Sequence, residues 1–191
     1  HPNPMVGALV VERGEIVSEG YHHACGQPHA EVEALASLGR KATSAAAMFI
    51  SLEPCSTHGK TPPCTGAILK SGITKVFVAT TDPNPKHAGA GLDLLRNAEV
   101  EVELANESIQ ARAERLNFIF NHNMVTGSPL VALKLAQSAN GMVAERSGYP
   151  SSVTGEEARQ DVMRWRRHFP AICVGAGTVL TDDPSLTSRL P

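Results

Sequence analysis

The sequence has few aromatic residues, little net charge and no long apolar run. Only 4% of its 191 residues are Phe, Trp or Tyr, and the net charge at pH 7 is −2. A protein that wraps nucleic acid needs a basic surface, often with interleaved aromatic side chains, so we expect no nucleic-acid partner. A transmembrane helix needs about 20 consecutive apolar residues. Because no stretch approaches that length, we expect no membrane-spanning segment.

Cysteine is also scarce, and the chain has four: Cys25, Cys55, Cys64 and Cys173. Four cysteines could form two disulfides in an oxidising compartment. Two of them accompany a histidine motif, however, and this favours metal binding in a reducing cytosol. We therefore expect a cytoplasmic protein. Cys173 lies in an apolar stretch and is expected to be a core residue.

Short apolar stretches alternate with stretches of helical periodicity over the first two thirds of the chain. The expected strands are residues 6–11, 15–20, 47–52, 75–80 and 100–104, and the expected helices are residues 29–38, 64–70, 91–97 and 107–121. Residues 13–14 form the turn of a hairpin between the first two strands. This alternation of short β-branched strands and helices predicts an α/β layer with crossover connections.

A second unit is predicted after Thr126-Gly127-Ser128-Pro129, which is the strongest boundary signal in the chain. Strands are expected at residues 130–135 and 171–174. Between them, Thr154 and Glu157 are expected to form a capping box at the start of a helix. The chain of 20.2 kDa is large enough for one full domain and part of a second.

The most informative pattern is a histidine followed much later by two cysteines. His29-Ala30-Glu31 opens a helical stretch, and prolines precede both Cys55 and Cys64. One imidazole and two thiolates suit Zn²⁺ and leave the fourth tetrahedral position for water. We expect both thiolates at helix starts, where the dipole stabilises anions. The pattern predicts a hydrolytic deaminase with ligands His29, Cys55 and Cys64, in which the catalytic residue Glu31 moves protons.

Other interpretations remain open from the residues alone. A closed structural zinc site needs a fourth protein ligand, and Cys25 is the candidate. Such a site would belong to a non-catalytic, zinc-stabilised interaction module. A deaminase of another base, a nucleoside or a tRNA would use the same ligands, although the low aromatic content and negative charge argue against tRNA.

Longer motifs surround the proposed ligands. They are Leu52-Glu53-Pro54-Cys55-Ser56, Gly59-Lys60-Thr61-Pro62-Pro63-Cys64, His1-Pro2-Asn3-Pro4 with Val6-Gly7-Ala8, and Asp82-Pro83-Asn84-Pro85 with Ala88-Gly89. Together they resemble the riboflavin-biosynthesis deaminase/reductase family of the cytidine-deaminase superfamily. The superfamily usually has Pro-Cys-x-x-Cys, whereas eight residues separate Cys55 from Cys64 here, as in the longer form of this family.

The resemblance implies a cytidine-deaminase-like three-layer α/β/α domain over residues 1–126. It also implies hydrolysis of the ring amine of 2,5-diamino-6-ribosylamino-4(3H)-pyrimidinone 5′-phosphate, a small-molecule pyrimidine nucleotide, by a homo-oligomer. The residues expected to contact this substrate are Asn3, Lys60, Asp82 and Asn84, with Lys60 on the phosphate. The family usually has histidine where this chain has Thr57, and His58 is displaced from that position by one residue.

For residues 127–191 the resemblance implies the start of a dihydrofolate-reductase-like α/β reductase domain, incomplete in this chain, that binds NADPH. Ala136, Thr178 and Asp182 would lie near the cofactor, and Arg166, Leu186 and Arg189 would face the substrate. Two motifs depart from the family: Ser138-Ala139-Asn140-Gly141-Met142 replaces Ser-Leu-Asp-Gly-Lys, and Pro150-Ser151-Ser152-Val153-Thr154 replaces Ser-x-Trp-Ile-Thr. We therefore expect no reductase activity from this chain alone.

Overall fold

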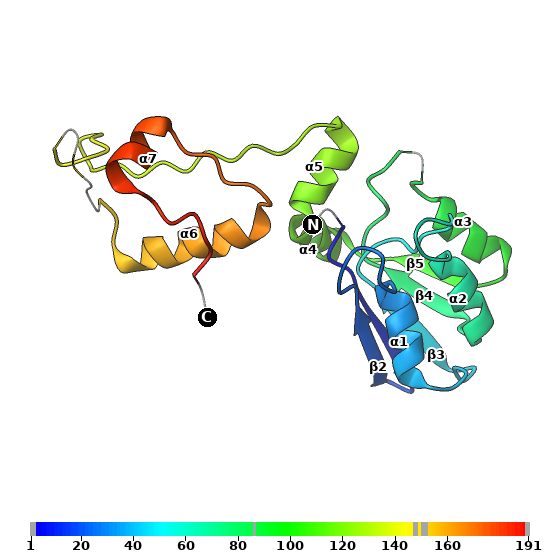
Figure 1. Cartoon of the computed structure of the whole chain (residues 1–191). Coiled ribbons are helices and arrows are strands. Elements are labelled where there is room, and N and C mark those ends of the chain that lie inside the picture. The colour runs from blue at the N-terminus through cyan, green and yellow to red at the C-terminus, as the bar shows by residue number, and fades with distance from the viewer. Residues whose placement is uncertain (1–2, 86, 147–148, 150–152, 190–191) are drawn as a thin grey trace. The chain divides into compact units, whose positions relative to one another are not determined.

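The computed structural model describes residues 3–85, 87–146, 149 and 153–189 (Figure 1). The chain divides into two units, residues 1–130 and 131–191, and each is described by itself. The motif residues His1-Pro2 and Pro150-Ser151-Ser152 lie outside the described residues. The division falls four residues after the boundary predicted at 126/127, and what each unit does remains a prediction.

A mixed sheet with the strand order β2-β1-β3-β4-β5 forms the centre of the first unit. The strands are β1 (Gly7–Glu12), β2 (Glu15–Tyr21), β3 (Ala46–Ile50), β4 (Lys75–Val78) and β5 (Glu101–Leu104). β1 pairs antiparallel with β2 and β3, whereas β3, β4 and β5 run parallel. Arg13 and Gly14 both have positive φ, as a tight hairpin turn requires. The five predicted strands of this unit are confirmed.

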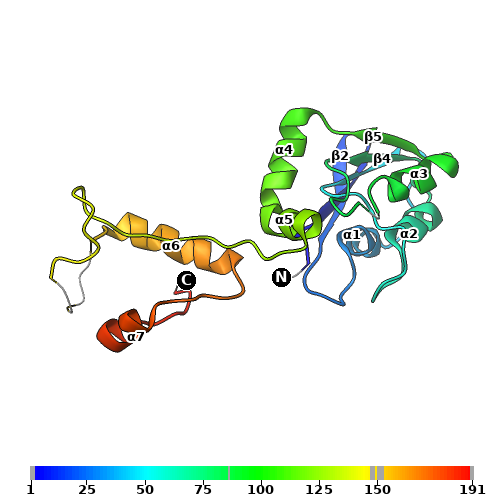
Figure 2. The same cartoon turned by 90° about the horizontal axis from the view of Figure 1, so that it is seen from above.

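Three helices cover one face of the sheet (Figure 2). They are α1 (Ala30–Leu38), α2 (Cys64–Ser71) and α3 (Ala90–Asn97), and each was predicted to within one residue at either end. The core forms where alternate strand side chains meet these helices, and its fully buried members include Val10, Met48, Val76, Ala34, Ile68 and Leu95. Gly39 and Gly72 end α1 and α2 in the left-handed conformation, which glycine adopts without strain.

The opposite face of the sheet carries apolar side chains along a groove of about 760 Å³. Phe49 and Phe77 stack across β3 and β4 with ring centroids 4.5 Å apart, and Lys75 lies over the Phe77 ring. The helix α4 (Glu107–Leu116) begins beside this face, where Ile109 lines the groove.

The helix predicted over residues 107–121 is instead two helices, α4 and α5 (Phe118–Thr126). The break lies at Asn117, a buried residue whose side chain accepts a hydrogen bond from Met5 N at 2.7 Å and donates to Met5 O at 2.9 Å. These two hydrogen bonds resemble the pair that two neighbouring strands exchange, and they fix the segment that leads into β1. The prediction missed the break because the partner is 112 residues away in the sequence.

The described part of the second unit contains α6 (Glu156–His168) and α7 (Ala176–Asp182). The strands predicted at residues 130–135 and 171–174 are absent from it, since a strand needs a hydrogen-bonded neighbour and neither segment has one there. Cys173 is exposed and not a core residue. The capping box is also wrong: the N-cap of α6 is Gly155 and not Thr154, and glycine has no side-chain oxygen with which to form one. Among the described helices, none has the length and apolar character needed to cross a membrane.

We expect Gly20→Ala to destabilise the first unit, because α1 packs directly on β2 at this glycine. A Cβ atom there would lie 2.6 Å from Ala30 O and 2.7 Å from Glu33 Cβ. Overpacking of this kind costs about 1–3 kcal/mol, measurable by urea unfolding. The control is Gly66→Ala in α2, where a Cβ meets no atom within 4 Å. Equal stability of the two variants would contradict the close approach.

The stability of the wild-type chain should fall in acid through Glu12. This buried carboxylate accepts hydrogen bonds from Arg40 and from Thr43 N, and these bonds lower its pKa from 4.5 to about 2. A lowered pKa stabilises the fold above pH 4.5, and this stabilisation is lost as the pH falls from 4.5 towards 2.

The test compares unfolding free energies of the wild type and Glu12→Gln between pH 7 and pH 2. Their difference should be constant above about pH 5 and shrink below it. Glu15→Gln, at an exposed glutamate of β2, is the control and should show no such convergence. A difference between the wild type and Glu12→Gln that is independent of pH would refute the prediction.

Candidate metal centre

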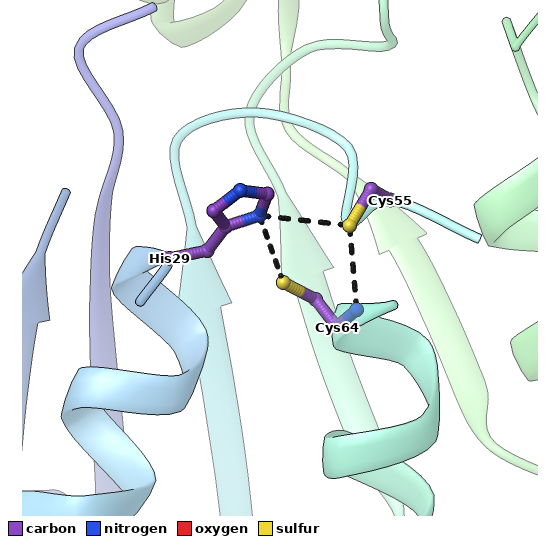
Figure 3. A group of neighbouring side chains, drawn as sticks. All are labelled: His29, Cys55 and Cys64. Atoms are coloured by element: carbon purple, nitrogen blue, oxygen red, sulfur yellow. Dashed lines mark hydrogen bonds between the residues drawn. The ribbon is translucent and has the colours of Figure 1, made fainter. Parts of the chain in front are cut away.

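The three predicted ligands come together from three separate segments. His29 is the N-cap of α1, Cys55 lies in the loop after β3, and Cys64 is the first residue of α2. Figure 3 shows both sulfurs facing the same nitrogen, with His29 Nδ1 3.5 Å from Cys55 Sγ and 3.2 Å from Cys64 Sγ. The ligand atoms all lie within 4.8 Å of one another. His29 Nδ1 is therefore the nitrogen that would bind a metal.

The other ring nitrogen of His29 is held by the cysteine loop. His29 Nε2 lies 3.3 Å from Thr61 Oγ1, and the His22 ring packs edge-on at 5.2 Å. A hydrogen bond to the nitrogen that does not bind the metal fixes both the tautomer and the orientation of a ligating imidazole. Thr61 and His22 thus orient Nδ1 towards the sulfurs.

The two thiols are electrostatically different. The Cys64 thiol donates to Cys55 and, opposed by burial, lowers the pKa of Cys55 to about 4, with further help from His29. The same interaction raises the pKa of Cys64. The pair therefore favours negative charge on Cys55, and a thiophilic cation would bind where the two sulfurs converge.

The expectation that both cysteines lie at helix starts is right only for Cys64. Cys55 lies in a loop, but its sulfur accepts the backbone N–H of Cys64 at 3.3 Å. This N–H belongs to the first turn of α2, whose unpaired amides stabilise an anion. The N-terminus of α2 consequently stabilises negative charge on both sulfurs.

Glu31 lies beside the ligands without being one of them. It is the second residue of α1 and only 3% exposed. Burial raises its pKa to about 7, and the negative charge of Cys55 adds to this effect. A carboxyl group that can hold or release a proton near neutral pH suits general acid/base chemistry.

Cys25, the candidate for a fourth ligand, is not part of the group formed by His29, Cys55 and Cys64. Its side chain is exposed and accepts a hydrogen bond from Lys60 Nζ at 3.3 Å. The described residues therefore leave one tetrahedral position without a protein ligand, as in catalytic zinc sites.

The predicted substrate residues of the first unit lie on three segments. Asn3 Nδ2 donates to His22 Nε2 at 2.8 Å, and His22 Nδ1 donates to Pro28 O, next to the ligand His29. Asp82 is half-buried, accepts the Asn84 N–H at 2.8 Å, and lines a small cavity together with Cys55. Burial raises the pKa of Asp82. Lys60 is exposed, as a phosphate ligand would be.

The histidine displaced to position 58 does not turn back towards the ligands. His58 is exposed, and its Nδ1 lies 3.1 Å from the carbonyl oxygen of its neighbour Gly59. Thr57, in contrast, lines the cavity beside Cys55.

Glu53 is a buried carboxylate that organises the site, and the sequence alone did not predict this role. Its Oε2 accepts Asp82 N at 3.0 Å and Gly89 N at 2.9 Å, and its Oε1 accepts Gly91 N at 2.8 Å. Glu53 thereby anchors both ends of the loop that carries Asp82 and Asn84. The sequence did contain one signal for this role, since Glu53 is a charged residue between a buried strand and the Pro54-Cys55 dipeptide. A buried charge needs several hydrogen-bond partners.

In the second unit, Arg166 is placed against the segment that carries Leu186. Its Nη1 donates to Ser185 O at 3.1 Å and to Thr187 O at 2.9 Å. Thr178 and Asp182 lie on α7 and are exposed, Arg189 is exposed, and Ala136 is half-buried in the segment before α6. Among the described site residues predicted for this unit, Arg166 and the segment around Leu186 are the ones that hydrogen bonds bring together.

Replacing Glu53 by Gln should loosen residues 82–91. An amide offers one accepting oxygen, so at least one of the three N–H groups of Asp82, Gly89 and Gly91 would face an NH₂ group and lose its acceptor. Each unsatisfied buried group costs about 1–3 kcal/mol. We expect faster amide hydrogen exchange in the loop and lower stability. Asp93→Asn in α3 is the control, since its exposed ion pair with Arg96 contributes little. Unchanged exchange in Glu53→Gln would refute the anchoring role.

Two family models match the chain. Residues 1–80 match the cytidine and deoxycytidylate deaminase zinc-binding region, and residues 129–191 match the RibD C-terminal domain. Among curated proteins, the riboflavin biosynthesis protein RibD of Bacillus amyloliquefaciens is 47% identical over 190 residues, which is 100% of this chain and 50% of the relative. RibD of Escherichia coli is 46% identical over 189 residues, covering 99% and 51%.

Solved structures agree with these matches. RibD of Acinetobacter baumannii superposes with a TM-score of 0.90 at 44% identity, covering 99% of this chain and 52% of that one. A diaminohydroxyphosphoribosylaminopyrimidine deaminase/5-amino-6-(5-phosphoribosylamino)uracil reductase from Thermotoga maritima gives a TM-score of 0.90 at 41% identity, covering 100% and 54%. The chain spans about half the length of the relatives it matches.

Proposed function

The chain belongs to the RibD family of riboflavin-biosynthesis proteins, and on this premise we propose that its first unit is a zinc-dependent hydrolytic deaminase. The observation that carries the proposal is the grouping of His29, Cys55 and Cys64 within 4.8 Å, with buried Glu31 beside them and outside the ligand set. One nitrogen and two sulfurs fit Zn²⁺ better than they fit magnesium or calcium, which prefer oxygen.

The proposed reaction replaces a ring amine by a carbonyl oxygen and releases ammonia. Zinc held by these ligands would supply Lewis-acid activation of water at neutral pH. Glu31 accepts a proton from the attacking water and passes it to the adjacent ring nitrogen. It then takes the remaining proton of the hydroxyl added to the ring carbon and delivers it to the amine, so that ammonia leaves and a carbonyl remains. Its pKa of about 7 suits both halves of this transfer, since the carboxyl group must alternate between acid and base.

The proposed substrate is the diaminopyrimidinone ribosyl phosphate that the family resemblance implies. Lys60 would bind the phosphate, where an exposed ammonium group acts as a point charge. Asn3, Asp82 and Asn84 would contact the ring and the ribose. We also propose that the chain acts in the cytoplasm, as its cysteine usage indicates, and as a homo-oligomer, as the family resemblance implies.

For the second unit we propose the start of the NADPH-dependent reductase half. Thr178 and Asp182 offer an exposed hydroxyl and carboxylate that fit the polar groups of a dinucleotide, with Ala136 nearby in the family pattern. Arg166, Leu186 and Arg189 would face the substrate. The departures at Asn140 and Met142 remove an acid and a base, so no reductase activity is expected from this chain alone.

The test of the deaminase is ammonia release from the pyrimidinone nucleotide by zinc-loaded protein. Glu31→Gln should lower the rate by about 10²–10⁴-fold, the usual contribution of general acid/base catalysis, while zinc content stays unchanged. Glu33→Gln is the matched control, because Glu33 lies about 200° around the same helix. Removal of zinc by a chelator should also abolish turnover. Wild-type rates in Glu31→Gln would overturn the mechanism.

A further inference from the structure

The loop that follows β4 carries a histidine into the cavity next to the metal ligands. This cavity, of about 40 Å³, is lined by Cys55 and Thr57 from the cysteine loop and by Asp82 and His87 from the loop after β4. His87 is half-buried. Neither the zinc ligands nor the predicted substrate contacts give this imidazole a role.

The backbone fixes the position of His87 from both sides. Its N–H donates to Asn84 O at 2.9 Å, and its carbonyl accepts the Ala90 N–H at 2.9 Å. The flanking residues Asp82 and Gly89 are held by Glu53 from inside the protein. His87 therefore lies on a loop with defined geometry, as a side chain used for recognition requires.

His87 also interacts electrostatically with Asp82. Burial raises the pKa of the Asp82 carboxyl, and the imidazole of His87 acts in the opposite direction. One wall of the cavity thus presents a carboxylate, which accepts hydrogen bonds, beside an imidazole, which can donate one. His58, the histidine of the cysteine loop, does not compete for this position because it lies against Gly59 O.

We propose that His87 contacts the heterocyclic ring of the substrate and, together with Asp82, selects for a ring that has a carbonyl next to a ring N–H. This inference rests on the proposed deaminase function. The carbonyl oxygen would accept from the imidazole, and the ring N–H would donate to the carboxylate. A site that pairs with polar groups of its substrate discriminates strongly against rings that lack them, because its own groups are then left unpaired.

Binding is measured separately from turnover to test this assignment. In a zinc-loaded Glu31→Gln background, calorimetry gives the dissociation constant of the diaminopyrimidinone nucleotide. Adding His87→Ala should weaken binding by about tenfold or more, the usual effect of losing a hydrogen bond to a ligand. Adding His87→Gln should restore part of the affinity, since an amide can still donate. Adding His58→Ala, at an exposed neighbouring histidine, is the control and should leave the affinity unchanged.

The outcomes separate this inference from the proposed function. Equal affinities with and without His87→Ala would overturn the role of His87 and leave the deaminase untouched. A loss of affinity that accompanies loss of zinc, without recovery in His87→Gln, would show a structural role and also overturn it. Failure of the Glu31→Gln protein and of the wild type to bind the nucleotide would remove both proposals. Binding that depends on His87 but no ammonia release by the wild type would remove only the deaminase.

Discussion

The packing of the N-terminal ends of α1 and α2 beside the end of β3 determines where the ligands meet. Ala30 and Ile68 are fully buried against the sheet, so each helix has little freedom to slide or rotate. His29 immediately precedes the first of these helices and Cys64 begins the second, while Cys55 follows the strand between them. Packing in the hydrophobic core therefore determines where the three ligand residues lie, and their side chains only complete the approach of the ligand atoms.

Two buried glutamates near the ligands illustrate how surroundings assign different roles to one residue type. Glu53 accepts three backbone N–H groups, so its negative charge is compensated and it serves as a fixed anchor. Glu31 is equally buried but lies near the sulfurs, and desolvation raises its pKa to about 7. A desolvated carboxyl group that titrates near neutrality suits proton transfer, whereas a carboxylate that accepts three backbone N–H groups suits the fixing of a loop. Positioning of the loop by Glu53 and the proton transfer proposed for Glu31 thus fall to different carboxyl groups.

The features that could be predicted from the sequence are those that depend on a local residue pattern. Those that depend on contacts between distant residues were missed. The zinc ligands were found because their residue types and neighbouring prolines are informative by themselves. Glu53 was passed over because its partners are backbone amides 29 to 38 residues away. The break at Asn117 depends on Met5, at the other end of the unit. In the second unit, the apolar segments predicted as strands have no paired neighbour among the residues that the structure describes, and Val131 and Leu133 are 86% and 90% exposed.

The contacts of the loop after β4 couple ligand geometry to substrate recognition through the main chain. A Cβ at Gly91 would collide with the carbonyl oxygen of Pro54, the residue before the ligand Cys55. Gly91 N also binds Glu53, the residue before that proline. A shift of the loop that moves Asp82 would therefore also displace the peptide between Pro54 and Cys55. For this reason a substitution that displaces the loop proposed to recognise the ring is expected to displace Cys55 as well, although the two lie in separate motifs.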